Sequence, residues 1–237
     1  MKHDNPASRF LAVIEKGQTF PKTDNCLATW RALLGPGCSD VVVVARLGKF
    51  MVLMEEVVGL LQKYYPDHQD MVAYWTSQVN SAFMTQNLQG QWATFMDRVD
   101  GHAVNYIRSS ASLLQSKIDS QLISDEQLAE LRSGLEALIN RVLELKIDSE
   151  LKRYVLLYLH RIISSIDEYK ITGAAGILQS MEAMIGHASF DVSYKDFFRD
   201  HEVGKAICNW IATAANLVTV AVALPQLELY GRLLTGG

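Results

Sequence analysis

Three side chains near the middle of the chain are of types that bind metal ions. Asp97, Asp100 and His102 lie within six positions of one another. In a helix, Asp97 and Asp100 would share a face while His102 points elsewhere, because residues three apart lie on one side. The Glu-x-x-His and His-Glu-x-x-His patterns of helical metal sites do not occur. We therefore expect no metal site and no cofactor.

Acidic and basic residues in the order used by restriction-like nucleases also occur. Pro66 and Asp67 are followed much later by residues 150–152 (Glu-Leu-Lys), which superficially resembles the PD-ExK arrangement. In those nucleases the acids lie on neighbouring strands, where alternate residues face one metal. Here both parts fall at predicted helix starts, and residues 144–146 repeat the short pattern by chance. A capping Asp and ordinary surface charges are the favoured interpretation.

The sequence contains no motif for nucleophilic catalysis or for phosphate binding. The sequence has no Gly-x-Ser-x-Gly elbow, and residues 35–37 (Gly-Pro-Gly) lack the Gly-Lys-Ser/Thr that completes a phosphate loop. Cys26, Cys38 and Cys208 show no Cys-x-x-Cys spacing, which favours a reducing, cytoplasmic compartment. We predict no catalytic residue. An all-α enzyme whose site is assembled from distant residues would leave no motif, and it stays an alternative.

A stretch without charged residues, 71–96, mixes amides with aromatic side chains. Amides make adaptable hydrogen bonds and aromatic rings supply apolar area, a composition typical of protein interfaces. The alternative is that the aromatics face the core and the amides face water. The predicted interface residues are Tyr74, Trp75, Gln78, Asn80, Gln86, Asn87 and Trp92.

Residues 206–224 are uncharged and about long enough to cross a bilayer core, which needs roughly twenty residues. Asn209, Thr213 and Asn216 recur at four and three residues and form one polar stripe on an alanine-rich rod. Such a stripe suits a polar cavity, a partner helix or the lumen of a membrane assembly. We expect a long apolar C-terminal helix that is buried or docked in a soluble fold. A membrane-active effector that inserts this helix is the alternative.

The whole chain has the composition of a folded globular protein. Of its 237 residues 49% are hydrophobic and 20% charged, which allows a sizeable core. The formal net charge of -4 gives no field to hold a polyanion, so we expect no nucleic-acid partner. Asp4 and Pro6 precede any apolar run, unlike a secretory signal or a transit peptide. We expect a cytoplasmic protein, with membrane association through residues 206–224 as the alternative.

Start and stop signals along the chain are those of helices. Asn5 precedes Pro6 at a predicted helix start, and Pro66 forces an extended residue before it. Residues 41–44 are four valines that would also suit a buried strand, but no second strand-like run exists to pair with them. We predict an all-α multi-helix bundle of about eight to ten helices. It is taken as one domain, 1–237, with a soft boundary near residues 119–124.

Two long helices are expected to form a hairpin at the centre of this bundle. Residues 124–127 (Ser-Asp-Glu-Gln) fit a capping box, and apolar residues then recur at three and four positions up to Leu145. A second helix begins at Asp148, and the short connector requires antiparallel neighbours. Before the hairpin, one helix is expected from Gln91 to Ile118, with Gly101 as a candidate kink.

The second half of the hairpin resembles uncharacterised bacterial helical proteins. The resemblance is carried by residues 151–156 (Leu-Lys-Arg-Tyr-Val-Leu) and 166–176 (Ile-Asp-Glu-Tyr-Lys-Ile-Thr-Gly-Ala-Ala-Gly), and it covers residues 124–187. Some of these proteins are encoded in mobile-element or phage-defence neighbourhoods. The resemblance implies a phage-defence or toxin-related setting, but it names no catalytic motif.

Together these patterns predict a non-enzymatic interaction or regulatory protein. Every catalytic arrangement above is better explained by capping or by surface charge, whereas the uncharged amide and aromatic stretch suits binding. The expected partner is another protein chain or a second copy of this one.

Overall fold

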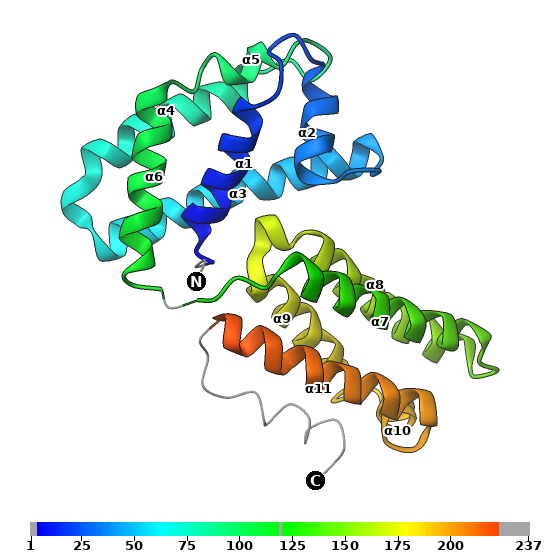
Figure 1. Ribbon diagram of the computed structural model, residues 1–237. Helices are drawn as coiled ribbons and strands as arrows, with labels where there is room; N and C mark the ends of the chain where they lie inside the picture. Colours follow the sequence, from blue (N-terminus) through cyan, green and yellow to red (C-terminus); the bar gives the residue numbers. More distant parts are fainter. Residues whose placement is uncertain (1–3, 119, 223–237) are drawn as a thin grey trace. The chain divides into compact units, whose positions relative to one another are not determined.

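Figure 1 shows the computed structural model, which describes residues 4–118 and 120–222. In these residues the chain forms eleven α-helices and one 3-10 helix, η1, and no β-strand. The all-α prediction is confirmed, with slightly more helices than expected. The elements are α1 (Pro6–Gln18), α2 (Cys26–Leu34), α3 (Asp40–Tyr64), η1 (Pro66–His68), α4 (Gln69–Thr85), α5 (Ala93–Met96), α6 (Gly101–Gln115), α7 (Asp125–Glu144), α8 (Ser149–Asp167), α9 (Tyr169–His187), α10 (Val192–Asp200) and α11 (Glu202–Val222).

The chain divides into two compact units. The described part of the N-terminal unit is residues 4–118 and 170–173, and that of the C-terminal unit is residues 120–169 and 174–222. The first crossover between the units falls at residues 119–120, within the stretch 119–124 where the sequence indicates a soft boundary. Each unit has a hydrophobic core of its own.

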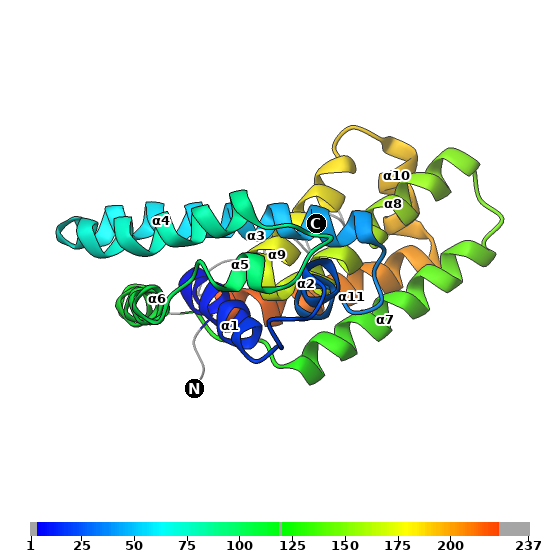
Figure 2. The ribbon, with the colours of Figure 1, turned by 90° about the horizontal axis from the view of Figure 1, so that it is seen from above.

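In the N-terminal unit, α1 packs against α3 and α6, while α6 also packs against α4 and α2 packs against α3. Figure 2 shows α3 and α4 side by side. Helix α1 begins at the expected cap and α2 begins in the same way, because the side chains of Asn5 and Asn25 accept hydrogen bonds from the N–H groups of Ser8 and Ala28. Such caps satisfy amides that a helix leaves without partners. The 25-residue α3 is the scaffold on which α1, α2 and α4 pack.

Aromatic rings fill the core of the N-terminal unit. The Trp30 ring meets Phe95 at a centroid distance of 4.8 Å and Trp92 at 5.0 Å, both edge-on. Trp30 Nε1 donates to Gln86 Oε1 (2.7 Å), and Trp92 Nε1 donates to the Gly17 carbonyl oxygen (2.8 Å). Because a buried indole N–H costs free energy when it is unpaired, these bonds fix the two rings in place.

The continuous helix expected from Gln91 to Ile118 is wrong, since the chain forms two helices, α5 and α6, separated by residues 97–100. The Asp100 carboxylate accepts a hydrogen bond from the Ala103 N–H (2.7 Å) and so starts a new helix. Aspartate favours caps over helix interiors because its side chain competes for backbone hydrogen bonds.

The loop before α5 also has a structural cause. Residues 88–93 pair with residues 22–27 through backbone hydrogen bonds, including those from Cys26 N–H to the Gly90 carbonyl (2.9 Å) and from Trp92 N–H to the Asp24 carbonyl (2.7 Å). A helix would use these backbone groups internally, so α4 ends at Thr85.

In the C-terminal unit, α7 and α8 pack together as the hairpin that the apolar spacing predicts (Figure 1). The capping box is present: Ser124 Oγ accepts from the Gln127 N–H, and Gln127 Oε1 accepts from the Ser124 N–H. Helix α11 packs against α7 and α10. The predicted core positions of α7 are buried, namely Leu128, Leu131, Leu135, Leu138 and Val142.

Helix α9 is broken at Gly173, whose φ of 64° lies in the left-handed region. A Cβ at this position would lie 2.5 Å from Arg9 Nη1. The Arg9 guanidinium donates to the Ile171 carbonyl oxygen (3.2 Å) and pairs with Asp4 (2.7 Å). Only glycine combines this backbone conformation with so close an approach. Residues 170–173 are thereby held against α1 within the N-terminal unit.

A helix lies where the apolar C-terminal segment is expected, but it is amphipathic. Helix α11 begins with Glu202 and includes Lys205, and residues 223 and 224 of the predicted segment lie outside the described residues. Across residues 4–118 and 120–222, no helix combines the length and the hydropathy needed to cross a membrane. The long apolar C-terminal helix is thus corrected to a helix with one apolar and one polar face.

Candidate functional site

The two tryptophans predicted to contact a partner belong to the core. Trp75 is 0% exposed and Trp92 is 1% exposed. The Trp75 ring packs against Phe10 at a centroid distance of 5.8 Å, and Trp92 packs against Trp30 as described. Burial of a large ring removes much apolar area from water, so aromatic residues at helical spacing turn inward. The prediction that these two side chains lie on a binding surface is therefore wrong.

The amides of the loop serve the fold. Gln86 Oε1 accepts the Trp30 hydrogen bond, and Gln86 Nε2 donates to the Phe83 carbonyl oxygen (3.2 Å). Asn87 is exposed, but its Oδ1 accepts from the Gln89 N–H (3.0 Å) and closes a tight turn. Both residues have a structural explanation that needs no partner protein.

The remaining predicted interface residues lie on α4. The Tyr74 hydroxyl donates to Asp100 Oδ2 (2.6 Å), and this hydrogen bond lowers the pKa of the Asp100 carboxyl and raises the pKa of Tyr74. Gln78 is half-buried and Asn80 is exposed. A role for these three side chains in binding stays a prediction.

The acidic residues considered as metal ligands have other partners. Asp97 pairs with Lys22 (2.6 Å), and Asp100 caps α6 while His102 lies exposed on that helix. In the part of the chain that the structure describes, no group of three or more His, Cys, Asp or Glu side chains is placed to hold a metal ion.

The polar stripe on α11 faces the solvent. Asn209, Thr213 and Asn216 are all exposed, and the opposite face buries Ile207 and Ile211. Thr213 Oγ1 donates to the Asn209 carbonyl oxygen (3.1 Å), which satisfies the hydroxyl within the helix. The stripe expected from the sequence is present, and within the described fold it lines no buried polar cavity.

Helix α3 shows the reverse arrangement, because apolar side chains lie on its solvent side. Val41 is 79% exposed, Val44 is 46% exposed and Val52 is 67% exposed, and Ala45 and Gly48 between them are exposed as well. We call these five residues the α3 face. The core side of the same helix buries other residues, namely Val43, Leu47, Phe50, Leu53, Met54, Val57 and Leu61.

Neither folding nor solubility accounts for the α3 face. Valine loses side-chain freedom in a helix and is a poorer helix former than alanine, lysine or glutamate. An exposed valine also leaves its apolar surface in water. A Cβ added at Gly48 would meet nothing within 4 Å, so the space above the middle of the face is open. Single exposed apolar residues are ordinary, but an uncharged stripe along one helix indicates a contact surface.

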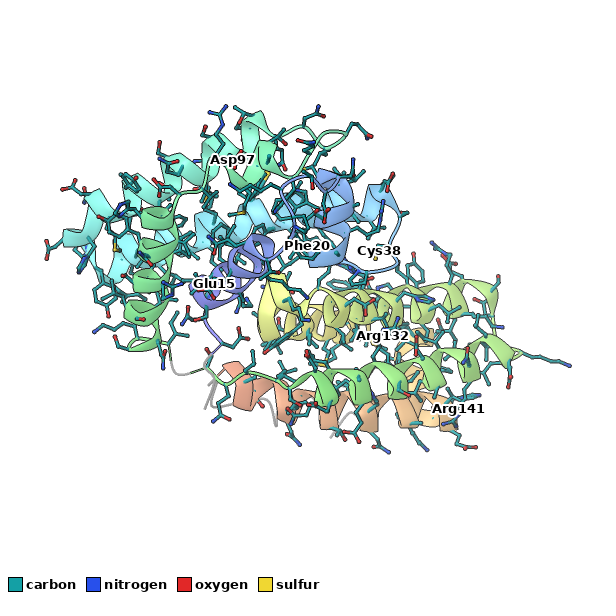
Figure 3. All side chains as sticks on the ribbon, turned by 45° about the horizontal axis from the view of Figure 1, so that its top comes forward. Glu15, Phe20, Cys38, Asp97, Arg132 and Arg141 are labelled. Atoms are coloured by element: carbon teal, nitrogen blue, oxygen red, sulfur yellow. The ribbon has the colours of Figure 1, made fainter. Side chains whose placement is uncertain are left out.

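The first turn of α3 is held rigidly next to this face. The buried Arg46 guanidinium donates to the carbonyl oxygen of Leu34, the last residue of α2, at 3.0 Å and lies 3.4 Å from Cys38 Sγ. Figure 3 labels Cys38 in the turn before α3. On the surface, Arg31 of α2 pairs with Asp40 of α3. These contacts fix the α3 face on a preorganised helix start.

Other exposed apolar side chains form no comparable stripe. Phe190 and Val192 of the C-terminal unit are highly exposed, but they lie two residues apart at the turn between α9 and α10. Met84 stands near the end of α4, among polar neighbours. Of the exposed apolar residues in the described ranges, those of α3 are repeated along a single helix over three turns.

An aromatic cluster in the C-terminal unit is a packing junction between helices. The His187 ring lies 4.6 Å from Tyr154, 5.3 Å from Tyr158 and 4.7 Å from Tyr194, measured between centroids. These residues join α8, α9 and α10. Burial raises the pKa of Tyr194, whose hydroxyl has no hydrogen-bond partner among the described residues. The cluster is held by ring packing, and Asp191 Oδ2 lies 3.7 Å from His187 Nε2.

The α3 face was not predicted from the sequence, where residues 41–44 suit either a helix or a buried strand. The signal was present in the spacing, since Val41, Ala45, Gly48 and Val52 recur at four, three and four residues. That is the spacing of a helix–helix seam. This spacing is hard to recognise in the sequence, because the core residues of α3 form a second apolar pattern on the opposite side of the helix.

Comparisons with known proteins found no similar protein. No family model, no curated protein and no solved structure matches the chain. The resemblance of residues 124–187 to bacterial helical proteins is accordingly not shown by these comparisons.

Proposed function

We propose that the protein is an interaction or regulatory protein that binds another polypeptide chain through the α3 face. The observation that carries the proposal is the exposed stripe from Val41 to Val52 on a helix whose other side is fully packed. Burial of these valines by a partner would be favourable by about 25 cal/mol per Å² of apolar surface. The preorganised helix keeps the entropic cost of binding low.

The shape of the face favours a helical partner. Ala45 and Gly48 lie at its middle, between the larger Val41 and Val52. Small residues let a second helix approach closely, and flanking valines then pack around it. A partner helix with apolar residues at three and four positions would fit this surface.

A photo-crosslinking amino acid at Val52 tests the proposal in cells that naturally express the protein. We expect a discrete covalent adduct, and the adduct should disappear when Val41→Lys is added, because a charge in the face disfavours desolvation. The matched control places the same amino acid at the exposed Asn216 on α11, where no adduct is expected. Equal adducts at both positions, or none at Val52, would contradict the proposal.

A further inference from the structure

We infer that the chain bound at the α3 face is a second copy of this protein, with the two α3 helices antiparallel. This inference rests on the proposed function, because it uses the same face. The face is self-complementary, which a two-fold symmetric contact requires.

Four residues of the α3 face, Val41, Ala45, Gly48 and Val52, are spaced symmetrically about their midpoint, and the fifth, Val44, falls opposite the exposed Lys49 of the second copy. When a second α3 is laid against it in the opposite direction, Val41 of one copy lies opposite Val52 of the other, and Ala45 lies opposite Gly48. The small residues then meet at the two-fold axis, where the helices are closest, and the exposed valines pack at both ends. Each copy offers large side chains where the other has large ones and small where the other has small.

Charge selects the antiparallel direction over the parallel one. Glu55 is exposed and continues the seam three residues after Val52. In a parallel pair the two Glu55 carboxylates would face each other, which is unfavourable. In the antiparallel pair, Glu55 of one copy lies beyond the start of the other copy's α3. The cap residue there, Ser39, makes no side-chain cap hydrogen bond, and Asp40 is already paired with Arg31.

The α3 face is short. The distance from Val41 to Val52 along the helix is about 16 Å, because each residue adds about 1.5 Å. Such a contact is small beside a standard stable interface, which buries roughly 1,200 to 2,000 Å². We therefore expect a weak dimer whose population rises with concentration.

The test introduces charges at positions 41 and 52, which face each other in the antiparallel pair. Dimerisation of the full chain is measured by sedimentation velocity over a range of concentrations. Val52→Glu alone and Val41→Lys alone should each weaken the dimer by at least about tenfold, because a charge is left unpaired opposite a valine. The double variant Val41→Lys, Val52→Glu should restore it, since each Lys then faces a Glu of the other copy. Circular dichroism checks that all three variants stay folded.

The matched control is Val192→Glu, which adds the same charge at a 74% exposed valine of the C-terminal unit. It should dimerise like the unchanged protein. A monomeric unchanged protein at every concentration, or a dimer that Val52→Glu does not weaken, overturns the inference. A double variant that stays monomeric overturns the antiparallel direction, because a parallel pair would place Lys against Lys and Glu against Glu.

Failure of this inference can be told apart from failure of the proposed function. If the unchanged protein is monomeric but Val52 still crosslinks to a different chain, the α3 face binds another partner, and only the inference fails. If Val52 gives no adduct and the protein is monomeric, both fail.

Discussion

Helices α3 and α11 turn opposite kinds of side chain to the solvent. Both contain uncharged stretches and both pack one face into a core. On α11 the exposed positions are polar, namely Asn209, Thr213 and Asn216, and the apolar residues face α7 and α10. On α3 the exposed positions include Val41, Val44 and Val52, although the opposite side already supplies a full core face.

The difference separates apolar residues that folding requires from those that it does not. An apolar stripe that packs within the chain is explained by its burial, as on α11. A second apolar stripe on the water side of α3 has no such explanation, and it points to contact with another chain. Hydropathy alone would select α11 as the candidate contact helix and would miss α3.

The largest expected effect comes from the core side of α3. Phe50 is fully buried and stacks on Phe10 with ring centroids 4.6 Å apart. Phe50→Ala should lower the free energy of unfolding of the N-terminal unit by about 3 to 5 kcal/mol, because it leaves a cavity in an aromatic core. Urea unfolding followed by tryptophan fluorescence measures this. A loss below about 1 kcal/mol would show that this side of α3 is not packed.

A glycine on α11 and a glycine on α3 sharpen the comparison, because their replacement by alanine should change the free energy of unfolding in opposite directions. On α11, a Cβ at Gly204 would lie 2.1 Å from the Phe197 carbonyl oxygen, so Gly204→Ala should destabilise the C-terminal unit by about 1 to 3 kcal/mol. Gly186→Ala, where a Cβ would meet nothing within 4 Å, is the matched control and should not destabilise. Thermal unfolding compares the two, and equal stabilities would contradict the close packing of α10 on α11.

On α3 the corresponding change should stabilise the monomer. Gly48→Ala meets nothing within 4 Å and replaces a poor helix former by the best one, so stability should rise by about 0.5 to 1 kcal/mol. The measurement is made in the Val52→Glu background, which keeps the protein monomeric. A decrease in stability would mean that part of this chain covers the α3 face.

The smallest effect is expected on the exposed stripe of α11. Asn216→Leu should change the free energy of unfolding by less than about 0.5 kcal/mol, because the amide faces water. Denaturant midpoints of the two proteins test this. A loss of several kcal/mol would show that Asn216 makes a buried polar contact instead.

Local signals in the sequence predicted most helices, and an overlooked cap and a tertiary pairing explain the error over residues 91–118. The caps at Asn5 and Ser124 and the spacing that follows Ser124 depend on neighbouring residues alone, and they were confirmed. The break at residues 97–100 has a local signal in the Asp100 cap, whereas the loop between α4 and α5 depends on backbone pairing with residues 22–27, which lie far away in the chain. No local pattern records such a partner.

The candidate site was predicted less well than the fold. Trp75 and Trp92 have the composition of interface residues, but composition does not tell which side of a helix meets the core. On α3, Val41 and Val43 are the same residue type two positions apart, and only the packing against α1, α2 and α4 shows that Val41 is exposed while Val43 is buried. The spacing of Asn209, Thr213 and Asn216 places them on one exposed face of α11, because a period within one helix is visible in the sequence.

Methyl NMR of protein labelled at valine tests the central claim most directly, because it reports separately on exposed and buried valines of the same helix. As the concentration rises through the range of roughly 10 μM to 1 mM, the methyl signals of Val41, Val44 and Val52 should shift together. The signals of the buried Val43 and Val57 on the other side of α3 should stay unchanged. Constant signals from Val41, Val44 and Val52, with shifts confined to valines elsewhere in the chain, would contradict the account.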